Sequence, residues 1–316
     1  MTTSGVYAET TSTQQIIRQA MLNIGCLDAD EAPGPREYDD CRRMLNMMVS
    51  QWMGKSDFAP GLKVWTRKRG YVFLSPKTYQ YQLSSFNTQG WTNSFTKMQL
   101  MGSVGVGTNI ITLTGTVAVG QYIGLVCSDG TLFWTKIATI TPTITTVDNL
   151  TVSANGGANA YVYTTPAQYP VNIEAAVLRD DQDGDSPLRI MLQSTYDALS
   201  NKTDPTNFGD PTSIYYEENL GFTTVYTDVG AAQDVTKYIV LTYMEPVQKF
   251  INPTDEPEYP EEWYQAIHFS LSKLIAPMFK KKWTDLLESN RMESMMIARN
   301  KSGEKSSLYF QPGVDE

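Results

Sequence analysis

Histidine and cysteine are scarce in this chain of 316 residues, and their scarcity limits its chemistry. The only histidine is His268, and the three cysteines are Cys26, Cys41 and Cys127. An odd, scattered set of cysteines does not predict a disulfide framework, so a reducing compartment fits best. A general base needs a partner and a nucleophile, and a zinc site needs several ligands. His268 lacks such companions, so we expect a packing or interface role and no catalytic residue, metal or cofactor.

Long apolar runs are also missing, and so is a charged start followed by an apolar segment. We therefore expect no membrane span and no signal peptide, in a soluble protein made inside a cell. Positive charge is in deficit, since 25 Lys and Arg face 34 Asp and Glu, a net charge of −9. Coating DNA needs clustered cations that release counterions from phosphates, so this balance argues against that role.

The first third of the chain carries helical periodicity. Ser12 and Gln15 form a capping-box pattern before a predicted helix over residues 14–24. A second helix is predicted over residues 37–53, where apolar side chains recur every three or four residues. We expect the packing anchors of these helices and of a later one to be Leu45, Met48, Trp52, Trp263 and Ile267. From Leu62 the period changes to two, which indicates strands.

Charge almost disappears between about residues 98 and 173. The only charged residues there are Asp129, Lys136 and Asp148, while Thr, Val, Ile and Gly dominate. Short strand-like units alternate with turns, and SDG between QYIGLVC and TLFWTKI is a hairpin signal. This pattern predicts a small β-barrel or sandwich module inserted into a host domain, with residues 84–97 and 164–169 as its connections.

The remainder predicts more strands and then two helices, over residues 260–279 and 283–300. The expected fold class is α+β: a helical bundle built from N- and C-terminal helices, an antiparallel β host domain and the inserted β-module. The expected divisions are residues 1–97, the module at 98–173, residues 174–300 and an arm at 301–316. The arm is polar apart from Leu308, Tyr309 and Phe310. Three large apolar side chains are costly in water unless buried, so they predict an anchor.

Several motifs resemble functional sites without completing them. GSVGVG at residues 102–107 lacks a following Lys-Ser/Thr and leads into a strand, unlike a phosphate loop. DDQDGD, with Asp181, Asp183 and Asp185, has crowded carboxylates, but its glycine is out of register with a calcium loop, so a solvated turn is favoured. The lysines at 280–282 are expected to end a helix, and the run Arg67-Lys68-Arg69 to protect a strand edge.

The order of the motifs resembles one protein family. The motifs are IIRQAMLNIG, MLNMMVSQWMGKSDFAPGLKVWTRKR, LSPKTYQYQLSSF, LVCSDGTLFWTKI, SPLRIMLQSTYDALSNKTDPTNFGDPTSIYYEE, YMEPVQKF and EYPEEWYQAIHFSLSKLIAPMF. Together they are similar to the head-to-tail adaptors, or tail accessory factors, of short-tailed bacteriophages. The sequence departs from the family at Asp210, inside GDPT, and in VYTDVGAAQD, where a Trp-Pro pair is usual.

The resemblance implies a virion protein of the tail or neck, assembled in the host cytoplasm. It implies a ring of sister subunits, normally twelve, beneath the portal protein. The ring would extend the DNA channel without sequence-specific binding, join the tail nozzle or knob, with tail fibres as a further candidate partner, and help retain packaged DNA. Leu308, Tyr309 and Phe310 are then the predicted portal-binding residues, with the portal as the arm's partner.

Two alternatives stay open. A peptidoglycan-degrading tail component would need two carboxylates flanking a cleft, whereas Glu261 and Glu262 are adjacent and diverge on a predicted helix. A receptor- or glycan-binding module would use aromatic side chains of the inserted segment as stacking platforms, although alternation along strands favours the core for most of them. Those aromatics are Tyr122, Phe133, Trp134, Tyr161 and Tyr163.

Overall fold

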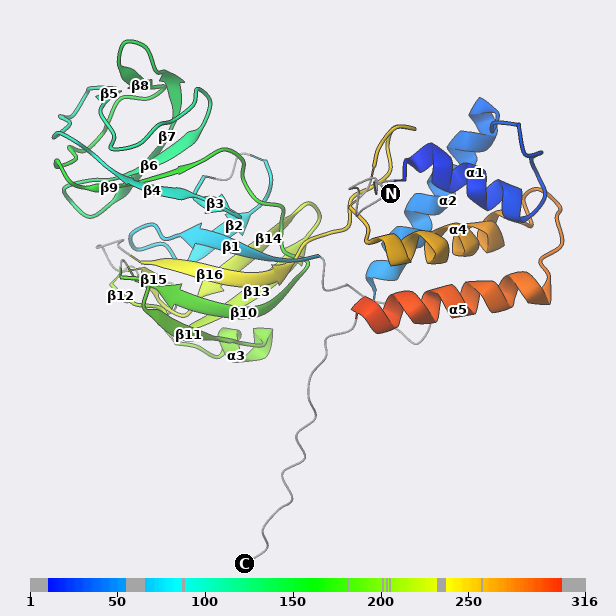
Figure 1. Cartoon of the computed structure of the whole chain (residues 1–316). Coiled ribbons are helices and arrows are strands. Elements are labelled where there is room, and N and C mark those ends of the chain that lie inside the picture. The colour runs from blue at the N-terminus through cyan, green and yellow to red at the C-terminus, as the bar shows by residue number, and fades with distance from the viewer. Residues whose placement is uncertain are drawn as a thin grey trace, which may run out of the picture. The chain divides into compact units, whose positions relative to one another are not determined.

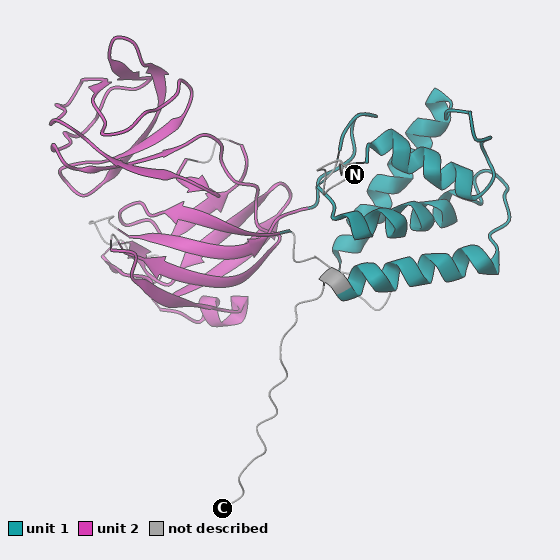
Figure 2. Cartoon of the chain, in the orientation of Figure 1, with its two compact units in different colours: residues 1–66, 247–316 teal, residues 67–246 magenta. Residues whose placement is uncertain are grey.

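The protein is α+β, with five helices and mostly antiparallel sheets in the part of the chain that the structure describes (Figure 1). The structure is a computed structural model that describes residues 11–54, 66–86, 89–180, 182–200, 202, 204, 206–231, 237–256 and 258–302. Contacts divide the chain into two compact units, residues 1–66 with 247–316 and residues 67–246 (Figure 2). The domain boundaries expected from the sequence remain predictions.

The first unit is helical. Its helices are α1 (Thr13–Asn23), α2 (Pro35–Met53), α4 (Glu261–Ile275) and α5 (Asp285–Ser302). The capping box of α1 is confirmed, because Gln15 N donates to Ser12 Oγ and Ser12 N donates to Gln15 Oε1. Two orphan amides at the start of α1 are thereby satisfied. Pro260 stands at the N-cap of α4, one residue before its expected place inside the helix.

Buried side chains from these four helices form one hydrophobic cluster. Its fully covered members include Ile17, Met21, Leu45, Ile267 and Leu271. Because the contributing segments lie near opposite ends of the sequence, the core of this unit depends on long-range contacts. Burial of such side chains contributes roughly 1.5–3 kcal/mol each.

The end of α4 differs from the sequence-based expectation. The helix ends at Ile275 rather than near residue 279, because Pro277 has no N–H to donate to the preceding turn, although Ala276 before it keeps helical backbone angles. The lysines at 280–282 therefore do not end α4. Lys281 Nζ donates instead to Gly25 O at 2.6 Å, so it satisfies a carbonyl just beyond the C-terminus of α1.

The second unit contains an eight-stranded sheet in the order β2-β14-β13-β11-β10-β16-β1-β3. Its strands are β1 (Arg67–Phe73), β2 (Gln80–Leu83), β3 (Trp91–Thr92), β10 (Asn172–Arg179), β11 (Asp185–Ile190), β13 (Ser213–Asn219), β14 (Phe222–Thr227) and β16 (Tyr238–Met244). Glycine is required at position 70 of β1, because an added Cβ would lie 2.1 Å from the buried ring of Trp91.

One pairing in this sheet is parallel, although the sequence predicted an antiparallel host sheet. β11 and β13 pair in parallel through Arg189 with Ser213 and Ile190 with Ile214. The intervening segment contains α3 (Gln193–Asp197) and returns the chain to the start of β13, as a parallel connection requires. A second parallel pair joins the short strands β12 (Phe208–Gly209) and β15 (Gly230–Ala231).

A six-stranded sheet of the same unit is nearly closed and barrel-like (Figure 1). Its strands, in the order β4-β9-β6-β7-β8-β5, are β4 (Thr96–Gln99), β9 (Asn159–Tyr163), β6 (Tyr122–Val126), β7 (Leu132–Thr139), β8 (Ile144–Thr146) and β5 (Ile110–Ile111). The predicted SDG hairpin is confirmed, because β6 and β7 pair antiparallel across it. Ile123, Leu125, Ile137 and Val162 fill the interior.

Candidate functional site

A groove lies on the surface of the helical unit. It encloses about 850 Å³ and is lined by residues from α2, α4 and α5. Each helix contributes side chains at helical spacing, so each presents one continuous face. α2 supplies Met48, Gln51 and Trp52, α4 supplies Ser270, Lys273 and Leu274, and α5 supplies Arg291, Met292, Met295, Met296, Arg299 and Asn300.

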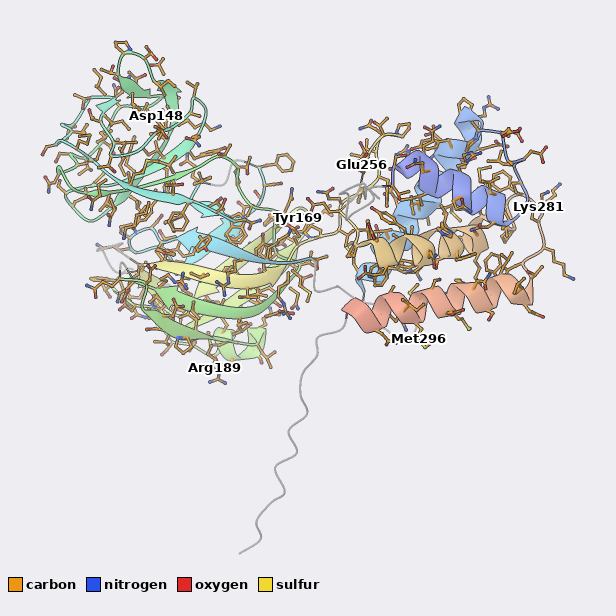
Figure 3. The ribbon with its side chains drawn as sticks, in the orientation of Figure 1. Asp148, Tyr169, Arg189, Glu256, Lys281 and Met296 are labelled. Carbon is orange, nitrogen blue, oxygen red and sulfur yellow. The ribbon has the colours of Figure 1, made fainter. Side chains whose placement is uncertain are left out.

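Methionine dominates the apolar lining of the groove. Half of the chain's fourteen methionines lie in α2 and α5. Met48 and Met295 are buried beneath the surface, whereas Met292 and Met296 are 58% and 59% exposed. Figure 3 labels Met296 on α5. Methionine side chains are flexible and polarisable, so such a surface can adapt to an apolar partner and favours contact with aromatic rings.

Two polar atoms in the groove are buried without a hydrogen-bond partner among the described residues. They are Ser270 Oγ on α4 and Arg299 Nε on α5. Ser270 is 7% exposed, so water does not readily satisfy its hydroxyl. Leaving a buried donor unpaired costs about 1–3 kcal/mol. These two atoms lie beneath the lining of the groove, out of reach of solvent.

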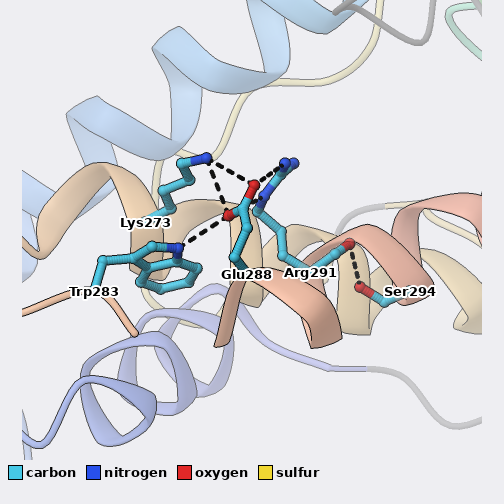
Figure 4. A network of polar contacts seen from close by, with 5 residues as sticks. All are labelled: Lys273, Trp283, Glu288, Arg291 and Ser294. Carbon is cyan, nitrogen blue, oxygen red and sulfur yellow. Dashed lines mark hydrogen bonds and ion pairs between the residues drawn. The ribbon is translucent and has the colours of Figure 1, made fainter. Parts of the chain in front are cut away.

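An ion-pair network at one side of the groove joins α4 to α5 (Figure 4). Arg291 donates to Glu288 through Nη2 at 2.7 Å and Nε at 3.0 Å, and Lys273 Nζ lies 2.9 Å from Glu288 Oε1. Trp283 Nε1 donates to Glu288 Oε2 at 2.9 Å. The hydrogen bonds from Arg291, followed by those from Lys273 and Trp283, lower the pKa of Glu288 to about 2. Glu288 is therefore ionised at neutral pH.

His268 lies outside the groove, where α4 meets α1. Its Nδ1 is 3.0 Å from Asn23 Nδ2, and the same amide donates to Ser272 Oγ. Ser272 Oγ has two main-chain acceptors for its single proton, His268 O at 2.6 Å and Ala20 O of α1 at 2.9 Å. Burial lowers the pKa of His268 to about 4, so the ring is neutral at pH 7 and its Nδ1 can accept from Asn23. This arrangement fits a packing residue that helps hold the two helices together.

The packing anchors expected from the sequence lie close together. Leu45, Met48, Trp263 and Ile267 are buried in the helical cluster, and Trp52 packs against it. The rings of Trp52 and Trp263 meet edge to face with their centroids 5.8 Å apart. Two of these five anchors, Met48 and Trp52, also line the groove. Leu308, Tyr309 and Phe310 lie outside the described residues.

Aspartates of the DDQDGD turn accept hydrogen bonds from residues close to them in the chain. Asp180 Oδ1 accepts from Gln182 N and Gly184 N, and Asp185 accepts two hydrogen bonds from Arg179. Asp181 lies outside the described residues. Across the described chain, no three His, Cys, Asp or Glu side chains gather as they would around a metal ion. Glu261 and Glu262 occupy the first turn of α4.

The aromatic side chains considered for glycan stacking mainly contact one another. Tyr161 and Tyr163 are buried. Tyr122 stacks on Tyr163 with centroids 4.9 Å apart, and Trp134 lies so close to Gly124 that an added Cβ would be 2.6 Å from its ring. Phe133 packs against the barrel interior. Tyr122, Phe133 and Trp134 are partly exposed.

No family model and no curated protein matches this chain. Among the described residues, no helix has both the length and the apolar character that crossing a bilayer requires.

Sequence reasoning identified Met48 and Trp52 but missed the α5 side of the groove. Met292, Met296 and Arg299 belong to RMESMMIARN, whose apolar residues at spacings of three and four could have indicated a second apolar face. That signal is ambiguous in the sequence, because Met295 and Ala298 alternate with them and are buried. Only the packing of α5 determines which of these residues are buried in the core and which remain exposed.

Proposed function

We propose that the chain is a structural head-to-tail adaptor of a short-tailed bacteriophage. In this role it is a virion protein that forms a ring of sister subunits, with twelve expected, beneath the portal protein. The ring extends the DNA channel, joins the tail nozzle or knob and helps retain packaged DNA. The order of the sequence motifs supports this proposal, as does the net charge of −9, which would let DNA slide through without adhering.

The observation that carries the proposal is the apolar exposure of α5. Met295 and Ala298 close the core of the helical unit, while Leu286 is 72% exposed and Ile297 is 46% exposed. A helix that is apolar on more than one side is suited to burial between two proteins. In the proposed ring, α1, α2, α4 and α5 act as a helical bundle, and the open side of α5 contacts a neighbouring subunit.

The arm supplies the second attachment in this proposal. Leu308, Tyr309 and Phe310 would anchor the adaptor to the portal, each contributing roughly 1.5–3 kcal/mol if buried, offset by the ordering of the arm. Repetition around a ring would convert this modest affinity into firm attachment.

A reconstitution experiment tests the adaptor role. Purified chain mixed with the portal ring of the same phage should form an added ring, visible by negative-stain microscopy and by cosedimentation. Replacing Leu286 and Ile297 together by aspartate should prevent the ring, because charge cannot be buried between subunits without cost.

The matched control replaces Glu293, an exposed residue of the same helix, by glutamine. It should assemble like the wild type, and circular dichroism should show that both variants remain folded. Failure of the wild-type chain to bind portal rings, or normal rings from the aspartate variant, would contradict the proposal.

A further inference from the structure

The groove on the helical unit leaves apolar surface uncovered beside the point where α5 ends. Met292 and Met296 are more than half exposed, Leu274 is 38% exposed, and Arg299 and Asn300 line the end of the groove nearest Ser302. The chain continues from this end of α5 through residues 303–316.

The composition of residues 303–316 complements the groove. The segment reads GEKSSLYFQPGVDE, with one compact apolar triplet, Leu308-Tyr309-Phe310, and three carboxylates against one lysine. Aromatic rings contact methionine sulfur favourably. The acidic side chains of the segment favour the positive charge of Arg299, which lines the groove.

The distances allow the same chain to fill its own groove. Met292 lies ten residues before Ser302, which is about 15 Å along a helix. Leu308 lies six residues beyond Ser302, and six extended residues span about 20 Å. Gly303 is the residue type that most often lets a chain reverse direction after a helix. The apolar triplet can therefore reach Met292 and Met296 without help from another copy.

We propose that residues 303–316 dock intramolecularly in this groove, with Leu308, Tyr309 and Phe310 covering Met292 and Met296. The docked segment shields the apolar surface of the free chain. It also occupies the triplet that the adaptor proposal assigns to the portal, so portal binding would require its release. The docking itself does not depend on the adaptor role, and its test needs no portal.

Methionine oxidation tests the docking in the full chain. Limited hydrogen peroxide treatment followed by peptide mass spectrometry measures the rate of sulfoxide formation at each methionine. Met47 on α2 and Met101 in the second unit are each 67% exposed and do not line the groove, so they are internal references. Met292 and Met296 should oxidise several-fold more slowly than these references in the wild-type chain.

Replacing Leu308, Tyr309 and Phe310 together by serine should raise the oxidation rates of Met292 and Met296 to those of Met47 and Met101. A matched control, Ser306→Ala with Ser307→Ala, should retain the protection. Continued slow oxidation of Met21, which is fully buried in the helical cluster, shows that each variant remains folded.

Three results would overturn the proposal. The first is equal oxidation of groove and reference methionines in the wild-type chain. The second is protection that survives the triple serine substitution, since another cover would then be responsible. The third is protection that disappears on dilution, because the segment would then come from a second copy rather than from the same chain.

Discussion

At the residue scale, His268 shows how one buried polar side chain can make stability depend on pH. It is the only histidine, its Nδ1 lies 3.0 Å from Asn23 Nδ2, and burial lowers its pKa to about 4. Protonation would place a charge in a low-dielectric site and would remove the acceptor that Asn23 uses. The neutral ring therefore belongs to the folded state.

The sign of the effect follows from the two pKa values. In the unfolded chain the pKa of histidine is about 6.5, so between that value and about 4 the unfolded chain binds more protons than the folded chain. Stability is therefore full above pH 6.5 and falls as pH decreases toward 4. We expect His268→Gln to lower stability slightly at neutral pH and to remove about 2–3 kcal/mol of the acid-induced loss.

Urea unfolding at several pH values measures this difference, and the single imidazole resonance gives the pKa of the folded chain directly by NMR. A glutamine side chain does not titrate, so any pH dependence of stability that remains in the variant comes from other groups. Parallel pH profiles for the two proteins would show that His268 does not cause the acid sensitivity.

At the scale of elements, Glu288 is the residue that ties α5 to α4. Its carboxylate accepts hydrogen bonds from Arg291 on its own helix, from Lys273 on α4 and from Trp283 in the connection between them (Figure 4). Few side chains of α5 are buried, among them Met295 and Ala298. The polar network therefore contributes appreciably to holding α5 against α4.

Glu288→Gln should therefore destabilise the helical unit by about 1–2 kcal/mol at neutral pH, a value reduced for partial solvent screening. Because the folded pKa is lowered, the stabilisation is present above the usual glutamate pKa, about 4.5, and is lost as pH falls toward 2. The difference in stability between the variant and the wild type should shrink over the same pH range. Thermal unfolding monitored by circular dichroism measures it.

Glu293→Gln is the matched control, because Glu293 is exposed on the same helix. It should unfold like the wild type at every pH. Equal unfolding temperatures for Glu288→Gln and Glu293→Gln at neutral pH would show that the network does not stabilise α5.

At the scale of the whole molecule, the proposed adaptor needs a template to assemble. Exposed apolar residues on α5 favour association, whereas the net charge of −9 opposes it between free chains. The intramolecular docking of residues 303–316 would further reduce the apolar surface available before assembly. We therefore expect the free chain to be a monomer and to form rings only on the portal.

Sedimentation or light scattering of the purified chain should accordingly give about the mass of one chain, 35.4 kDa.

Deleting residues 303–316 should leave a folded chain, since the helical cluster of the described residues extends no further than Ala298. The shortened chain should no longer assemble on portals. A stable ring without portal would contradict the templating prediction, and full assembly of the deletion variant would contradict the role of the arm.

The sequence by itself determined the local elements of this protein. Period and capping predicted α1 and α2, and SDG predicted the β6–β7 hairpin, because these features depend on neighbouring residues. The same local logic failed at Pro277, where the apolar period continued past the residue that ends α4. A periodic pattern indicates which face is apolar, but it does not outweigh the missing N–H of a proline.

Only the tertiary structure decided which apolar residues remain open and which chain segments pair. Met292, Met295 and Met296 are chemically alike, close together on α5 and all part of the groove lining, yet Met295 is buried in the core while the other two are more than half exposed. The parallel pairing of β11 with β13 likewise depends on the path of the connection through α3. Burial and pairing between distant segments are set by how whole elements pack, and this packing is not encoded in any short stretch of sequence.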